Sequence, residues 1–151
     1  MTKIFAQMVS NAVLWTAIVS WAIAQLIKII IEWARTRRFN AALIVSSGGM
    51  PSSHTSFVTA MTTYIGIKEG FDSSIVALSL VFSLVVMYDA VGVRRAAGHH
   101  ASAINTLFES FAEQGLKLDK KLKELLGHSP IEVAAGALLG ITVAIIAAFM
   151  L

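Results

Sequence analysis

The chain has 151 residues, enough for one domain, with a net charge of +3 and no cysteine. Hydrophobic residues make up 56% of it and charged residues only 14%, whereas soluble domains average about 45–50% and about 25%. This composition, with a mean hydropathy of +0.74, excludes a disordered chain and argues against a water-soluble one. Without cysteine there are no disulfides, no thiol catalysis and no cysteine-bound metals. A charge this small gives no reason to expect a nucleic-acid partner.

Four stretches lack charged side chains, and the first and last are long enough to cross a bilayer, which takes about 20 apolar residues in a helix. The sequence therefore predicts an all-α integral membrane protein, a single membrane domain of residues 1–151 built from a bundle of about four transmembrane helices. We expect the spans at residues 8–33, 52–68, 74–93 and 131–151. The two middle spans are short or polar at one end, so we expect them to be tilted or sheltered by neighbours. A signal peptide is the alternative for the first stretch, which lacks the basic start and small-residue cleavage site of such a segment.

Basic residues predict the orientation. Four spans put both termini on one side of the membrane, which carries Lys3 and Lys68. The opposite side carries a larger basic set: Arg35, Arg37, Arg38, Arg94, Arg95, Lys117, Lys120, Lys121 and Lys123. The positive-inside rule makes this basic face cytoplasmic. We therefore expect an integral protein of a bacterial cytoplasmic membrane, in contact with the lipid bilayer.

The segment 101–126 is predicted to be an amphipathic helix rather than a span. Its apolar residues recur at helical spacing among charged ones: Ile104, Leu107, Phe108, Phe111, Leu118, Leu122 and Leu125. Such a helix lies on the membrane surface or covers the ends of the spans, with a break expected at Gly115. A solvated linker helix and a gate over a substrate site are both open as its role.

Polar side chains suited to chemistry fall at helix ends, all on the basic face. The first pair is Lys28 and Arg35, which share one helix face about 10 Å apart along the axis. With Glu32 between them they form either an ion-pair ladder that anchors a helix end or two cations aimed at a phosphate.

A second group begins the next span. Ser52 or Ser53 is a natural N-cap, and a helix N-terminus binds anions through its free N–H groups and its dipole. His54 then lies in the first turn, beside any bound anion. Capping with an interfacial histidine is the alternative interpretation.

A third group precedes the last span. Ser129, Pro130 and Glu132 form the pattern of a capping box. That pattern leaves His128 unexplained, four residues before Glu132. A carboxylate near a histidine fixes its tautomer and raises its basicity, so capping and catalysis are competing interpretations of Glu132.

A fourth group surrounds Asp89, which lies deep for a charge. An ionisable group in a span indicates a functional site, and its expected partner is Arg94 or Arg95. A purely structural ion pair is equally open. His99 and His100 are considered as metal ligands, but few carboxylates lie near them in the sequence, and we expect no metal.

In order, these residues resemble the motifs KxxxxxxRP, PSGH and SRxxxxxHxxxD of the type 2 phosphatidic acid phosphatase superfamily, which includes the vanadium haloperoxidases. Lys28 and Arg35 keep the first spacing, with Thr36 in place of proline. The second motif is present as PSSH, with Ser53 in place of glycine. The whole chain from about Val9 resembles the divergent branch of small membrane proteins related to these phosphatases.

The third motif is matched only at its end, by His128 and Glu132, with glutamate in place of aspartate. The arginine of that motif would fall at Leu122, which cannot bind phosphate. The missing charge would have to come from elsewhere, and the candidates are Lys121, Lys123, Arg94 and Arg95.

The resemblance implies a phosphatase that acts on a lipid phosphate or pyrophosphate without metal or cofactor. His128 would form a phosphohistidine, Glu132 would hold its ring, and His54 would serve as acid and base. Further groups would neutralise the phosphoryl oxygens: Lys28, Arg35, Ser53 and either Arg94 or Arg95.

Two other classes fit the same residues. A catalytically inactive lipid-headgroup binder, flippase or assembly factor would need only the cations and helix termini. A small transporter would require oligomerisation. Small residues in the last span permit close packing within one subunit or in a homo-oligomer: Ala134, Ala135, Gly136 and Gly140.

Overall fold

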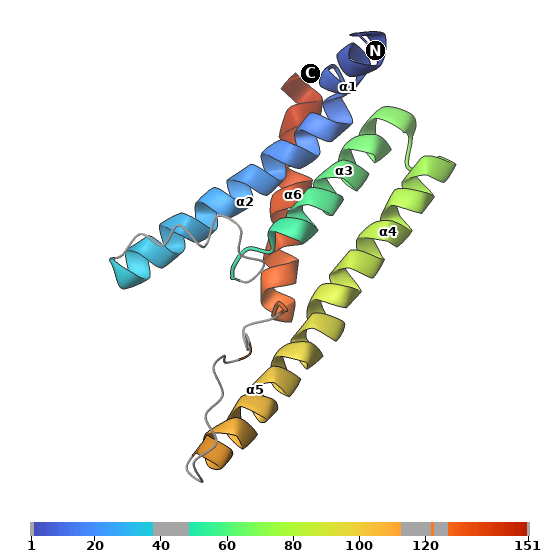
Figure 1. Cartoon of the computed structure of the whole chain (residues 1–151). Helices are drawn as coiled ribbons and strands as arrows, with labels where there is room; N and C mark the ends of the chain where they lie inside the picture. The colour runs from blue at the N-terminus through green and yellow to red at the C-terminus, as the bar shows by residue number, and fades with distance from the viewer. Residues whose placement is uncertain (1, 38–48, 113–121, 123–126, 151) are drawn as a thin grey trace.

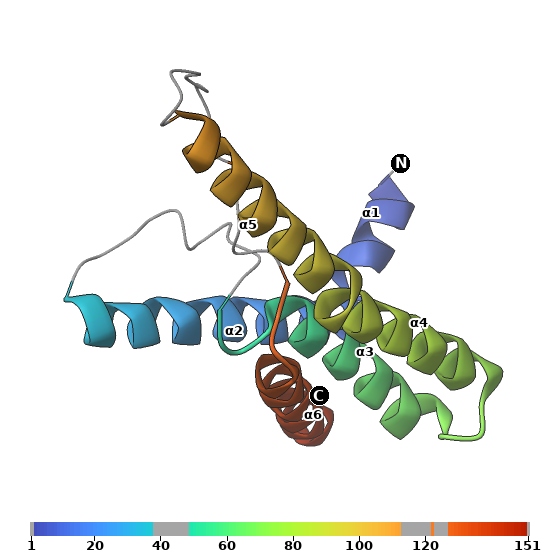
Figure 2. The same cartoon turned by 90° about the horizontal axis from the view of Figure 1, so that it is seen from below.

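The computed structural model describes residues 2–37, 49–112, 122 and 127–150, and the regular structure of these residues is entirely helical. The helices are α1 (Thr2–Val9), α2 (Ala12–Thr36), α3 (Ser53–Glu69), α4 (Ser74–Val91), α5 (Val93–Ala112) and α6 (Pro130–Met150). Both termini lie at the same end of the bundle, and α5 extends beyond the opposite end (Figure 1). The view from below shows α2, α4 and α6 arranged around α3 (Figure 2).

Three helices of the described chain are long and apolar enough to cross a membrane: Ala12–Thr36, the continuous stretch Ser74–Phe111, and Pro130–Met150. Large apolar side chains on α2, α4 and α6 are exposed, as expected for surfaces that face lipid. These features establish a membrane protein, with three candidate spans where the sequence predicts about four.

The difference lies in α3, which has 17 residues and covers only about 25 Å. Its bounds agree closely with the predicted span at 52–68, but it is shorter and more polar than a lipid-facing helix. It packs against α2, α4 and α6. Because protein surrounds α3, its side chains do not have to be apolar.

Hydroxyl groups join α3 to its neighbours. The Ser20 and Ser56 Oγ atoms lie 2.6 Å apart between α2 and α3. On the other side, Thr62 Oγ1 lies 2.8 Å from Ser83 Oγ of α4, and that serine donates to the Val58 carbonyl at 3.2 Å. Such bonds contribute about 0.6 kcal/mol each on average between membrane helices. They hold α3 in one position.

Glycines bring α6 against the third side of α3. A Cβ on Gly136 would collide with the Ser52 carbonyl oxygen, and one on Gly140 would collide with the Thr59 hydroxyl and the Ser56 carbonyl. The small-residue face of the last span therefore packs inside this subunit. This packing places the start of α6 beside the start of α3.

Two helix starts differ from the prediction. The first span begins at Ala12 rather than near residue 8, because the Asn11 side chain accepts a hydrogen bond from the Leu14 N–H at 3.1 Å and caps α2. The amphipathic segment begins at Val93 rather than 101, since α5 follows α4 after a break at Gly92. The predicted break at Gly115 and most of 113–126 lie outside the described residues.

Candidate active site

The candidate site lies at the end of the bundle opposite the chain termini. Three segments meet there: the second half of α2, the start of α3, and the loop that leads into α6. They contribute Lys28, the Ser53–His54 pair and the His128–Glu132 pair. The sequence places these residues at helix ends, and the fold brings those ends together.

Lys28 and Ser53 form a buried pair. The Lys28 Nζ donates to the Ser53 Oγ at 3.2 Å, and the two residues are 3% and 0% exposed. Gly49 lies against the lysine stem, where an added Cβ would come within 3.7 Å of it. A buried ammonium requires an anionic or polar partner, so this lysine is well placed to bind an anion.

Ser52, rather than Ser53, caps α3. Its Oγ accepts hydrogen bonds from the Thr55 N–H at 3.4 Å and the Thr55 hydroxyl at 2.9 Å. Its own N–H donates to the Glu132 carbonyl at 3.0 Å. The starts of α3 and α6 are thereby tied together, and both present the positive ends of their helix dipoles to the same region.

His128 is 3% exposed and is held at both its ring and its backbone. Its Nδ1 lies 2.9 Å from the Glu132 Oε2, and its backbone N–H donates to the Ala90 carbonyl of α4 at 2.9 Å. Gly127 has a φ of +87° and lies directly against the Arg94–Arg95 backbone, where a side chain would not fit. The histidine loop is thus fixed to the α4–α5 junction.

Glu132 makes the contacts of a helix cap and also contacts the His128 ring. Its Oε2 contacts the His128 ring and also accepts from the Ser129 N–H at 3.3 Å. The Glu132 N–H donates to the Ser129 Oγ at 3.3 Å, which completes the capping box. One carboxylate oxygen therefore caps the helix and orients the histidine.

The other ring nitrogen of His128, Nε2, is buried and has no hydrogen-bond partner within the described residues. A carboxylate can only accept, so Nδ1 carries a proton, and in the neutral ring this tautomer leaves a lone pair on Nε2. A buried polar atom without a partner costs about 1–3 kcal/mol. The buried Nε2 is therefore available to a ligand that enters the site.

His54 lies in the first turn of α3, outside the three candidate spans, with an exposed side chain. Partial desolvation lowers the pKa of its imidazole, and electrostatic interactions with Arg94, then with His128 and Lys28, lower it further. The Asp89 carboxylate opposes these effects and raises the pKa. The ring is therefore mainly neutral near pH 7 until an anion arrives beside it.

Of the two arginines that the sequence suggests as partners of Asp89, the structure pairs Arg94 with it. The Arg94 Nε lies 2.6 Å from the Asp89 Oδ2, and both side chains are partly exposed. The pair crosses the α4–α5 junction, next to the Gly127–His128 loop. Because Arg94 also influences His54, the pair belongs to the surroundings of the site.

Other predicted residues are not brought into contact with this centre. Arg35 is exposed in the last turn of α2, and no hydrogen bond or ion pair joins it to another described residue. Arg95, His99 and His100 are exposed on α5. Lys121 and Lys123 lie outside the described residues. Within the described ranges, no three His, Asp or Glu side chains gather in a way that could hold a metal ion.

The contacts of Ala90 were missed by the sequence analysis. Its carbonyl accepts the His128 N–H, yet it is an alanine at the end of an apolar helix, with no local signal of such a role. The contact is visible only in the structure, where the end of α4 lies beside the loop that leads into α6.

Comparison with known proteins gives a consistent result. Residues 9–143 match the sequence pattern of the divergent PAP2 family. A membrane protein of Bacillus subtilis (strain 168), YuiD, is 40% identical over 154 residues, which cover 95% of this chain and 98% of the relative. No solved structure matches the chain.

Proposed function

Because the chain belongs to the divergent PAP2 family, we propose that it hydrolyses the phosphate ester or anhydride of a membrane lipid through a phosphohistidine on His128. One observation carries the proposal. The His128 ring is buried, its Nδ1 is held by Glu132, and its Nε2 has no partner in the described chain. A structural histidine gains nothing from an unpaired nitrogen, whereas a nucleophile needs one.

The first step transfers the phosphoryl group to the protein. The Nε2 lone pair of His128 attacks phosphorus, and the bond from phosphorus to the leaving oxygen breaks. Protonated His54 gives its proton to that oxygen, so the product leaves as an alcohol or a phosphate. The His128 Nδ1 keeps its proton, and Glu132 balances the positive charge on the ring.

The second step returns the protein to its starting state. Neutral His54 takes a proton from water as the water oxygen attacks phosphorus, and the bond to Nε2 breaks. Inorganic phosphate leaves and His54 is protonated again. A neutral His54 in the free protein, as its lowered pKa indicates, suits this base role. The negative charge of a bound phosphate supplies the protonated form for the first step.

Cations and helix termini stabilise the phosphoryl oxygens in this proposal. Lys28 contributes its ammonium group, which already donates a hydrogen bond to the Ser53 hydroxyl. Arg94 replaces the arginine that the third motif lacks, with Asp89 orienting its guanidinium. Such preorganised charge is usually the largest contribution to catalysis. Arg35 and Arg95 stay candidates for the approach of the substrate.

The test uses purified protein in detergent with a chelator present. Wild type should release phosphate from lipid phosphates or pyrophosphates and form an acid-labile phosphoprotein. His128→Ala should lose both, while the matched control His99→Ala, on the exposed face of α5, should retain both. Turnover in folded His128→Ala protein would show that another residue is the nucleophile.

A lipid-phosphate binder or transporter is the second candidate. The Lys28–Ser53 pair and the two helix starts favour it, because they form an anion site that does not need His128. In that case wild type would bind vanadate or phosphate without turnover. Lys28→Ala would weaken this binding, and His128→Ala would leave it intact.

A further inference from the structure

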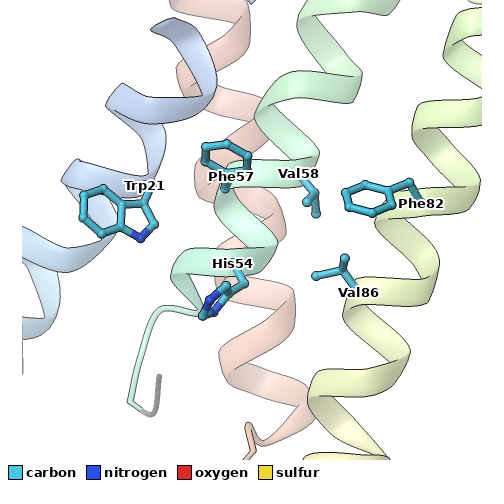
Figure 3. A pocket seen from close by; sticks show the side chains of 6 residues that line it. All are labelled: Trp21, His54, Phe57, Val58, Phe82 and Val86. Carbon is cyan, nitrogen blue, oxygen red and sulfur yellow. The ribbon is translucent and has the colours of Figure 1, made fainter. Parts of the chain in front are cut away.

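A pocket of about 360 Å³ opens beside His54, on the side of α3 away from α6 (Figure 3). Trp21 of α2 forms one wall, and Phe82 and Val86 of α4 form the other. The floor is α3 itself. The lining residues are Trp21, His54, Phe57, Val58, Phe82 and Val86.

The lining identifies an apolar occupant. Five of the six residues are aliphatic or aromatic, and only His54 carries an ionisable group. A polar ligand would lose its hydrogen bonds to water in this pocket without replacing them. Trp21 and Phe82 at the rim are 38% and 52% exposed, whereas Val58 in the floor is 3% exposed. The pocket therefore opens sideways, toward the lipid.

The pocket extends from His54 in the direction that an alkyl chain attached to a bound phosphate would take. Trp21 precedes Lys28 by two turns of the same helix, about 10 Å along the axis toward the terminal end of the bundle. His54 lies at the other end of the pocket (Figure 3), where its ring interacts electrostatically with Arg94 and Lys28. An occupant of the pocket thus places its last atoms at His54.

From this continuity we propose that the pocket binds one hydrocarbon chain of the phosphorylated lipid, a proposal that rests on the proposed function. If each methylene takes roughly the 30 Å³ of a water molecule, the pocket holds about twelve carbons. That is enough for one chain and too little for two. The α4 residues that line the pocket then determine which chain lengths it accepts.

The energetic role of the pocket depends on where the substrate comes from. A chain that leaves the bilayer exchanges one apolar surrounding for another and gains mainly packing. A short alkyl phosphate that is dissolved in water gains up to about fourfold in affinity per methylene buried. The dependence of affinity on chain length in monomeric alkyl phosphates is therefore the most direct measure of binding in the pocket.

The experiment compares Val86→Phe with Val85→Phe. Val86 lines the pocket, while its neighbour Val85 is 60% exposed on another face of α4. For wild type and Val85→Phe, kcat/KM for alkyl monophosphates should rise with chain length and level off near about twelve carbons. In Val86→Phe the ratio for dodecyl over butyl phosphate should fall at least about tenfold. A ratio unchanged by Val86→Phe, or no dependence on length in wild type, would overturn the proposal.

A second measurement does not depend on turnover. The chain has three tryptophans, so Trp15→Phe with Trp33→Phe leaves Trp21 as the single reporter. A dodecyl phosphonate brominated along its chain should quench Trp21 saturably, whereas brominated dodecanol at the same micellar concentration should not. Quenching without hydrolysis of any substrate would leave the chain site standing and remove the enzyme. Hydrolysis without saturable quenching would leave the enzyme and remove the chain site.

Discussion

At the scale of single residues, the central arrangement is one carboxylate oxygen that serves two donors. The Glu132 Oε2 contacts both the His128 ring and the Ser129 N–H. Because Ser129 takes part only in the cap, two substitutions separate the two roles. In the proposed mechanism the charge of Glu132 serves catalysis, whereas the reciprocal hydrogen bonds of the capping box serve stability.

Glu132→Gln should therefore lower kcat by about a hundredfold or more, by analogy with the loss of a carboxylate that orients a catalytic histidine. It keeps an amide oxygen for the Ser129 N–H, so the protein should stay folded. Ser129→Ala should do the reverse, with near-normal kcat and about 1 kcal/mol less stability. Kinetics and thermal unfolding of both variants check this. Equal losses of activity in the two would mean that Glu132 acts only as a cap.

Two charged neighbours of His54 should shift its pKa in opposite directions when each is replaced. Arg94 lowers the pKa of His54 and Asp89 raises it. Arg94→Gln removes a repelling cation, so the pKa of His54 should rise toward its ordinary value. Asp89→Asn removes the attracting carboxylate, so the same pKa should fall further. Histidine NMR titration measures both, and shifts of the same sign would show that the pair acts through structure rather than through charge.

At the scale of elements, α6 depends on glycine where it meets α3. Alanine normally stabilises a helix by about 1 kcal/mol relative to glycine. At Gly140, however, a Cβ would meet the Thr59 hydroxyl and the Ser56 carbonyl. Gly140→Ala should therefore lower stability by about 1–3 kcal/mol through overpacking, while Leu138→Ala on the exposed face of α6 should change it little. The unfolding midpoints of both variants in detergent measure this difference. A Gly140→Ala variant more stable than wild type would contradict the close packing of α6 against α3.

The helices were largely predictable because their ends carry local signals. Ser52 starts α3, and Pro130 with its capping box starts α6, each within a residue of the prediction. The start of α2 was not predictable from charge, because Asn11 lies inside an uncharged stretch and hydropathy averages over it. The three candidate spans differ from the predicted four for a related reason. The polarity of α3 is set by its neighbours, and a single sequence does not show which helix will be surrounded.

The sequence brings several candidate residues to notice, whereas most of their contacts appear only in the structure. His128, Glu132, Lys28 and Ser53 follow from motif spacing, and the structure pairs them as His128–Glu132 and Lys28–Ser53. The spacing of four also suggests the histidine–carboxylate contact. The choice of Arg94 over Arg95 as the partner of Asp89 depends on the backbone geometry at Gly92, between α4 and α5, which spacing alone does not fix. Arg35 shares a helix face with Lys28 in the sequence, yet the structure leaves it exposed.

At the scale of the whole molecule, the site and the termini lie at opposite ends of the bundle (Figure 1). Orientation in the membrane therefore decides which compartment supplies the water and receives the phosphate. From the positive-inside rule we predict that the basic site end faces the cytoplasm. Any lipid substrate would then have to present its phosphate to the inner leaflet.

The lack of native cysteine makes this orientation testable. Thr36→Cys lies at the site end and Asp72→Cys in the α3–α4 turn at the other end, and both positions are exposed. In intact bacterial cells, a membrane-impermeant maleimide should label Asp72→Cys at once and Thr36→Cys only after permeabilisation. The reverse pattern would place the site on the outer face.

The hydroxyl-rich surface of α3 also has a consequence for biogenesis. A helix that exposes Ser56, Thr59 and Thr62 is a poor lipid-facing segment until α2, α4 and α6 surround it. The last of these to leave the ribosome is α6, which carries Glu132 and directly follows His128. The membrane core and the candidate site are therefore completed together. A chain interrupted before His128 would have an unprotected third helix and would lack the proposed nucleophile, so quality-control proteases should remove it before it could bind lipid unproductively.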